Sequence, residues 1–332
     1  MHAAAINLRG GVSPRGTLLR GQGIIEYVLI IAVIGLVIVF AGPGVAGAIR
    51  NQFNLVGNTV NCGTTGGVEG GASGGDTDVV SEAVQTAVAK DAKDWTLDEQ
   101  KAVDEDIAAK GKASPAYAKA KAAMDAETKF SMKLTDGQTL EYKIIGINHD
   151  NLADGSGKAG LTFFTVTTDI ESSMNATDTT AGGWEKSELR AKMNSGETWN
   201  LMPSDFQSKV KSVRKLTNNV SGTDKNAAVT ATSDRLFLLS YSEIVPTSYW
   251  ASDYPWTSSE GTQYEAFKGK VTNNYTSNSY FSKDENIWWE RSMYPSEFDP
   301  EIEQFTLVGP DGCPSEFASA SCPYDICPAF CF

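Results

Sequence analysis

The stretch QGIIEYVLIIAVIGLVIVFA, residues 22–41, decides how the rest of the chain is interpreted, because it is apolar beyond its first turn. Residues 28–41 include no polar side chain. As a helix, residues 24–41 would reach about 27 Å, close to the hydrocarbon thickness of a thin bilayer. A soluble amphipathic helix would place polar residues at every third or fourth position. The stretch therefore predicts a membrane-spanning helix, which we expect to continue, kinked near Pro43, to about residue 60.

The start of this stretch carries a second signal. Glu26 stands at the entrance of the apolar run, Tyr27 follows it, and Gly21 lies five residues before Glu26. A carboxylate inside lipid is costly unless it is paired or lies at the interface. The sequence from Gly21 to Tyr27 resembles the processing site of type IV prepilins, and the Glu-Tyr pair resembles the Flp (Tad) pilins. The resemblance implies that a prepilin peptidase cuts after Gly21. The ammonium freed on Gln22 would then pair with Glu26 of the same or a neighbouring subunit.

The charge distribution gives an orientation and excludes one class of partner. Arg9, Arg15 and Arg20 precede the apolar run without any acid, which predicts a cytoplasmic N-terminus and an external remainder. The net charge of −13 argues against nucleic-acid binding, which needs a basic face. The resemblance implies as partners the prepilin peptidase, the pilus assembly machinery, other pilin subunits and the membrane.

A competing interpretation uses the same region. Ala46-Gly47-Ala48 follows a basic and then an apolar segment, which is also how a secretory signal peptide ends. Cleavage there would leave Ile49 as the first residue, whereas prepilin processing would leave Gln22. An anchor that is retained without cleavage is the third possibility.

The pattern of the rest predicts an α+β fold. Gly-rich composition indicates a flexible linker, the capping-box sequence Thr96 to Glu99 starts a helix, and Asp136-Gly137 turns a hairpin. Residues 235–240 predict a buried strand. The expected organisation is a prepilin leader at 1–21, a hydrophobic pilin or transmembrane helix at 22–60, a linker at 61–76, a helical spacer at 77–127, and an α+β surface domain with long loops at 128–332.

Residues from 130 onward carry a second resemblance. The landmarks WEKSELR (184–190), LFLLS (236–240), WWERS (288–292) and CPA (327–329) look like a bacterial surface-associated domain family of unknown function. The late Trp-Trp strand, followed by a closing C-terminal strand, is faintly similar to C-type-lectin-like folds. The Glu-Pro-Asn calcium motif of lectins is absent, so sugar binding is an analogy only.

Four of the five cysteines, Cys313, Cys322, Cys327 and Cys331, lie in the last twenty residues. Outside the cytoplasm such clusters usually form disulfides. In a strand Cys327 and Cys331 would lie about 13 Å apart, beyond disulfide reach, so each is expected to pair elsewhere, most simply with Cys313 and Cys322. A zinc site is the rival interpretation, but no Cys-x-x-Cys spacing is present. Cys62 would remain free or link subunits.

The sequence offers little for catalysis. Its two histidines, His2 and His149, have no identifiable nucleophilic partner set, so we expect a protein that is not an enzyme and needs no cofactor. Residues 148–157 are rich in oxygen ligands, and Asp150 and Asp154 are the candidates for a Ca²⁺ site. The loop departs from the EF-hand pattern at its twelfth position, so a tight surface turn is the alternative.

Trp250, Tyr254 and Trp256 lie among polar residues and are the candidate contacts for a glycan or protein ligand; burial in the core is the alternative. Ordinary Flp pilins are very short, so the large C-terminal domain suggests a minor or adhesive subunit of a Tad-like pilus that is displayed outside the cell. A secreted or membrane-anchored binding module without a filament is the alternative.

Overall fold

The computed structural model describes residues 80–167, 170–221, 227–246, 255–273, 287–295, 303–314 and 316–332. The predicted leader, the apolar stretch with Glu26, and the Gly-rich linker lie outside the described residues. Among the helices that are described, none has the length and apolarity needed to cross a bilayer. The described residues form a mixed α/β domain, which corrects the expectation of a helical spacer joined to a separate lectin-like α+β domain; the expected long N-terminal helix lies outside them.

The start of one helix was expected from the capping box of Thr96 and Glu99, and that signal acts as predicted. Ser81 caps the first helix by accepting from Val84 N, and Thr96 and Glu99 form both halves of a capping box. Because these caps satisfy exposed N–H groups of the first turn, each of these two helices begins directly after its cap. The elements are α2 (Glu82–Ala89), η1 (Ala92–Asp94), α3 (Leu97–Lys110), η2 (Gly111–Ala113) and α4 (Tyr117–Asp125).

These helices belong to the domain and are not a spacer. Asp104 of α3 accepts a hydrogen bond from Leu161 N at 2.6 Å, and Tyr142 donates to Gln100 at 3.1 Å. A Cβ at Gly160 would lie 1.9 Å from the carbonyl oxygen of Asp104, so only glycine allows the backbones this close. The helical region therefore packs directly on the first sheet.

The first sheet has the order β1-β2-β3-β11. Its first two strands form the predicted hairpin, with Phe130 opposite Tyr142. The last strand, from the C-terminal end of the chain, pairs antiparallel with β3, and Phe330 lies opposite Phe163. The strands are β1 (Phe130–Lys133), β2 (Thr139–Ile147), β3 (Leu161–Thr167) and β11 (Ala329–Cys331).

Aromatic side chains fill the core beneath this sheet. The Phe163 and Phe330 rings stack with centroids 5.4 Å apart, and Tyr142 meets Phe330 edge-on at 5.2 Å. Phe206 packs edge-on against Phe330 at 4.8 Å. Such pairs stabilise a fold beyond the burial of their surface, so β11 holds the centre of the core.

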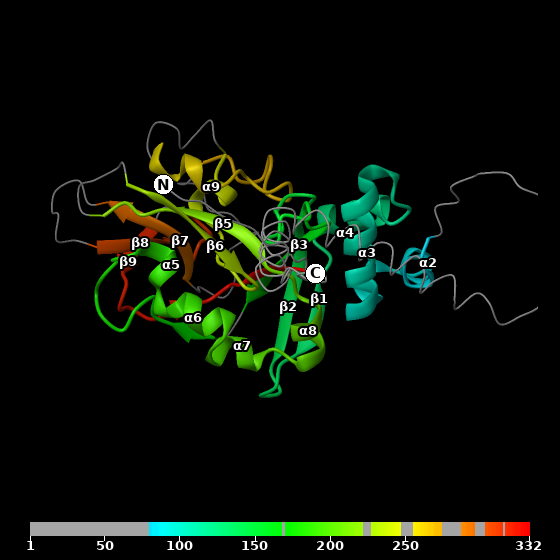
Figure 1. Ribbon diagram of the computed structural model, residues 1–332, viewed down its shortest axis with the longest axis horizontal. Coiled ribbons are helices and arrows are strands. Elements are labelled where there is room, and N and C mark those ends of the chain that lie inside the picture. Colours follow the sequence, from blue (N-terminus) through cyan, green and yellow to red (C-terminus); the bar gives the residue numbers. More distant parts are fainter. Residues whose placement is uncertain are drawn as a thin grey trace, which may run out of the picture. The chain divides into compact units, whose positions relative to one another are not determined.

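The second sheet has the order β4-β10-β7-β8-β9. Strands β5 and β6 form a separate two-stranded ribbon (Figure 1). Short helices connect these strands. The remaining elements are β4 (Glu171–Ser172), α5 (Gly183–Lys186), α6 (Glu188–Asn194), α7 (Glu197–Leu201), α8 (Ser204–Lys209), β5 (Val213–Asn218), β6 (Val229–Asp234), α9 (Tyr241–Ile244), η3 (Pro255–Ser259), β7 (Trp288–Pro295), β8 (Glu303–Val308), β9 (Glu316–Ser319) and β10 (Tyr324–Asp325).

Two local expectations differ from the structure. Residues 236–240 of the predicted strand 235–240 are buried as expected, but the segment forms a single β-bridge, between Phe237 and Ala329, and no strand. The expected disulfides are not formed, because Cys322, Cys327 and Cys331 are free thiols. Cys327 and Cys331 are buried, and Cys331 Sγ contacts Thr162 Oγ1 at 3.6 Å. The cysteines near the C-terminus thus act as small core residues.

Candidate functional site

A bulge in β7 creates the most unusual feature of the domain. The register of β7 with β8 shifts between Trp289 and Met293, and three residues, Glu290, Arg291 and Ser292, lie within the shift. A bulge turns neighbouring side chains toward the same side of a sheet. All three are fully buried, so an acid, a base and a hydroxyl enter the interior together.

Arg291 binds three backbone carbonyls and one carboxylate. Its Nε donates to Leu216 O at 3.2 Å, and Nη1 donates to Leu238 O at 2.7 Å and to Glu243 Oε2 at 2.6 Å. Nη2 donates to Glu260 O at 2.9 Å. The planar guanidinium thereby joins β5, the segment before α9 and the segment after η3 to β7.

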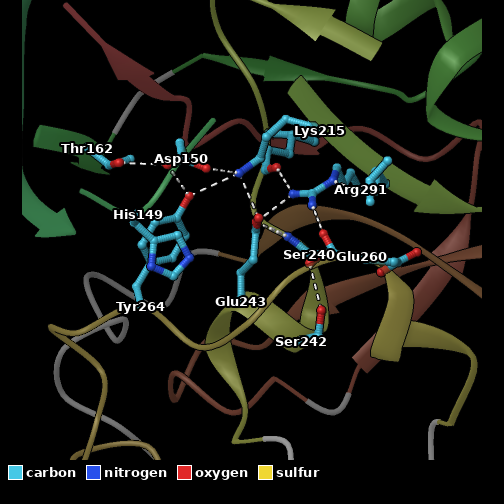
Figure 2. Close-up of polar contacts among 12 residues, drawn as sticks. His149, Asp150, Thr162, Lys215, Ser240, Ser242, Glu243, Glu260, Tyr264 and Arg291 are labelled. Carbon is cyan, nitrogen blue, oxygen red and sulfur yellow. Dashed lines mark hydrogen bonds and ion pairs between the residues drawn. The ribbon is translucent and has the colours of Figure 1, made fainter. Parts of the chain in front are cut away.

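Lys215 of β5 is the second buried cation. Figure 2 shows its ammonium between the carboxylates of Asp150 and Glu243. Its Nζ lies 2.6 Å from Asp150 Oδ1 and 2.6 Å from Glu243 Oε1, and 3.0 Å from the Tyr264 hydroxyl. The ammonium also lies 4.1 Å from the centre of the Phe237 ring. Two carboxylates and two aromatic rings therefore replace the water that a lysine normally requires.

Asp150 supplies the carboxylate from the turn after β2. Its Oδ2 accepts hydrogen bonds from Thr162 at 2.6 Å and from Tyr264 at 2.8 Å. Burial alone would raise the pKa of this carboxyl, but the adjacent Lys215 ammonium brings the pKa down to about 2. Asp150 is thus a buried partner of a lysine.

Asp154, the other Ca²⁺ candidate, lies at the surface and caps its own turn by accepting from Ser156 N at 2.9 Å. It lines a surface hollow of about 330 Å³ together with Lys211 and Ser233. Within the described residues, no three acidic, histidine or cysteine side chains gather as metal ligands. The structure therefore gives Asp150 and Asp154 different surroundings, and places Asp150 in the charge cluster.

Glu243 connects the two cations. It is the third residue of α9, where its Oε2 accepts from Ser240 N at 3.0 Å in a capping box. Burial opposes its ionisation, but Arg291 and Lys215 hold the pKa of Glu243 below its usual value. Two cations and two ionised carboxylates therefore neutralise each other inside the domain.

Two further carboxyl groups, those of Glu260 and Glu290, are buried beside these two cations and two carboxylates. Burial raises the pKa of Glu260 to about 7, although Glu260 accepts from Asn218 N at 3.0 Å and from the Ser292 hydroxyl. Burial raises the pKa of Glu290 to about 8, against the opposing effect of the nearby Thr306 hydroxyl. That hydroxyl donates instead to Ser292 O at 3.1 Å, and neither carboxyl oxygen of Glu290 has a hydrogen-bond partner among the described residues. Near neutral pH these two carboxyls hold protons that an exposed glutamate would lose.

Of the predicted ligand-binding residues, Trp256 lies in the core, and the others lie outside the described residues. Trp256 is buried, 5% exposed, and donates from Nε1 to Met293 O at 3.1 Å, so the structure places it in the core. Trp250 and Tyr254 lie outside the described residues, as do Gly21, Gln22, Glu26 and Tyr27. His149 stacks on Tyr264 with ring centres 4.0 Å apart.

Sequence reasoning missed the principal members of the cluster. Lys215, Glu243 and Arg291 are far apart in the chain, and no spacing links them. One signal was present, since Ser240-x-x-Glu243 is a capping box directly after an apolar run. A second was the charged pair Glu290-Arg291 following two tryptophans, which is unusual in a strand that otherwise reads as buried.

Comparison with known proteins gives one match. The family described as "Domain of unknown function (DUF6273)" matches residues 161–332, just over half of the 332-residue chain. Neither the curated proteins nor the solved structures contain a match. The match includes Lys215, Glu243 and Arg291 but begins after Asp150.

Proposed function

The chain belongs to the DUF6273 family of domains of unknown function, and we propose that it is a pilin-like surface protein. In this proposal the apolar stretch 22–41 inserts in the membrane and later assembles with other subunits, and residues 80–332 form the displayed domain. The subunit is a minor or adhesive one in a Tad-like filament, because so large a domain departs from the short Flp pattern.

One observation carries the proposal: a single acid, Glu26, stands at the start of a long apolar run and five residues after Gly21. Cleavage after Gly21 creates an ammonium on Gln22, about one helical turn from Glu26. The pair neutralises a charge that would otherwise be unfavourable among packed apolar helices.

The interior of the domain supports a display role over a catalytic one. Lys215, Arg291, Asp150 and Glu243 are each at most 5% exposed and form ion pairs with one another. Charges used in this way join strands and loops from distant parts of the chain. Because these side chains are buried, they favour a structural role for the cluster in a rigid module.

The processing site is tested by N-terminal sequencing of the exported protein. The proposal expects Gln22 as the first residue. A first residue at Ile49 would support a secreted module instead, and an intact leader would support an anchor that is retained.

The assembly step is tested separately with Glu26→Ala, using Glu26→Asp as the matched control. We expect Glu26→Ala to enter the membrane but not the filament, and Glu26→Asp to retain most assembly because it keeps the carboxylate. Normal incorporation of Glu26→Ala into filaments would contradict the charge-pairing mechanism.

A binding module without a filament is the second candidate, and one surface feature favours a binding role. Phe317 of β9 is 42% exposed and stacks on Tyr294 with ring centres 4.2 Å apart. An exposed stacked ring is a suitable contact for a sugar or protein ligand. The processed protein and its Phe317→Ser variant can be compared on a glycan array, where selective loss of binding by the variant would support the role.

A further inference from the structure

The trio of Asp150, Lys215 and Glu243 holds an amine between two carboxylates with little access to water. Lys215 Nζ is 2.6 Å from one oxygen of each acid, and the three side chains are at most 4% exposed. Groups held in contact react as if at an effective concentration of about 10⁵ M or more. We infer that Lys215 and Asp150 condense into an amide, which gives the domain an internal isopeptide cross-link.

The step balances without any added reagent. The ammonium of Lys215 carries three protons and the amide nitrogen keeps one. Glu243 takes a proton from Nζ, and the freed lone pair attacks Asp150 Cγ. The C–N bond forms, the bond from Cγ to Oδ1 breaks, and Oδ1 leaves as water with the two protons that Nζ has lost. Glu243 passes on its proton to this oxygen and ends as the carboxylate that it was at the start.

The other carboxyl oxygen of Asp150, Oδ2, accepts hydrogen bonds from two fixed hydroxyl groups. The Thr162 and Tyr264 hydroxyls donate to Oδ2 at 2.6 and 2.8 Å. When Nζ adds to Cγ, negative charge develops on this oxygen, and fixed donors in a dry site stabilise it.

The aromatic surroundings keep competing water away from the reacting atoms. Phe237 covers Nζ at 4.1 Å, and Tyr264 lies on another side at 5.5 Å from its ring centre. Hydrolysis of the product amide needs water at the same place, so the enclosure that favours condensation also protects the bond. The reaction occurs once per chain, and even a slow rate after folding completes it.

The cross-link would join two parts of the chain that the family match separates. Asp150 follows β2 and precedes the matched residues 161–332, whereas Lys215 lies in β5 within them. The bond would close a loop between residues 65 apart in sequence. It would fix the hairpin and the helices packed on it to the family domain.

Mass spectrometry of the full-length protein, unfolded and reduced, tests the inference. We expect the chain to be lighter than its sequence by one water. A tryptic digest should contain one branched peptide in which residues 144–158 are joined to residues 215–225. Lys215→Arg keeps the positive charge but should show the full mass and two separate peptides.

Two variants separate chemistry from folding. Asp150→Asn should form the same branched peptide with loss of ammonia in place of water, which keeps the test informative if Lys215→Arg does not fold. Glu243→Gln removes the proton carrier and should leave the chain at full mass.

The exposed pair Lys121 and Asp125 is the internal control. Its atoms are also close, at 2.5 Å, but the side chains are 44% and 58% exposed. The same digest should show this pair unlinked. Full mass for the folded wild-type chain would overturn the inference, and so would a water loss that maps elsewhere, such as the Asp136-Gly137 turn.

Discussion

Replacing the fully buried acid of the β7 bulge with its neutral isostere, Glu290→Gln, should stabilise the domain at high pH. Burial raises the pKa of this carboxyl from its ordinary 4.5 to about 8. The folded protein therefore binds this proton more tightly than the unfolded chain does. As pH rises from 4.5 to 8, the unfolded chain loses the proton first, and unfolding becomes more favourable.

The magnitude follows from the shift. The difference between 8 and 4.5 is 3.5 pKa units, and each unit corresponds to about 1.4 kcal/mol. Glutamine cannot ionise, so Glu290→Gln should raise the free energy of unfolding by about 5 kcal/mol at pH 9 and by less than about 1 kcal/mol at pH 5. The amide has the shape of the protonated carboxyl, so packing should be unchanged.

Urea unfolding followed by tryptophan fluorescence measures the difference, because all seven tryptophans lie between residues 95 and 289. Glu265→Gln is a control of opposite sign. Burial opposes ionisation of Glu265, but its contact with His149 holds the pKa below the usual value, so this variant should be less stable than wild type near neutral pH. A stability difference for Glu290→Gln that does not grow between pH 5 and pH 9 would refute the reasoning.

Arg291→Met should lower the free energy of unfolding by about 3–5 kcal/mol, since the change leaves the buried Glu243 carboxylate without the guanidinium that pairs with it; urea titration measures this, and a loss below about 1 kcal/mol would contradict it. Gly146→Ala should cost about 1–3 kcal/mol because the new Cβ would lie 2.8 Å from the Tyr264 ring, as a shift in thermal midpoint would reveal. The buried thiol of Cys331 should react with a maleimide only after the protein unfolds, and rapid labelling of the native chain at this residue would argue against its place in the core.

Local signals in the sequence predicted local structure well. The Thr96 capping box started α3 at the expected residue, and Asp136-Gly137 turned the β1–β2 hairpin. These features depend on residues a few positions apart, whose physical preferences do not require knowledge of the rest of the chain.

What could not be predicted depends on contacts between distant residues. The composition of residues 77–127, with few large apolar residues, predicted a helical spacer. It did not predict that Asp104 would accept a hydrogen bond from the backbone of β3. The cysteines read as disulfide partners from their spacing, which says nothing about burial. The charge cluster draws on Asp150, Lys215 and Arg291, and only the fold brings these residues together.

The pairing of β3 with β11 has a consequence for the time at which the domain can form. Phe164 lies opposite Ala329, so the first sheet needs two segments separated by 165 residues. Closing so long a loop is slow, and sheets of this kind fold late. A nascent chain would thus stay loosely organised until its last residues are synthesised, and would acquire its final shape only then. Refolding of the purified protein within about a millisecond, as for local helical bundles, would exclude this course of events.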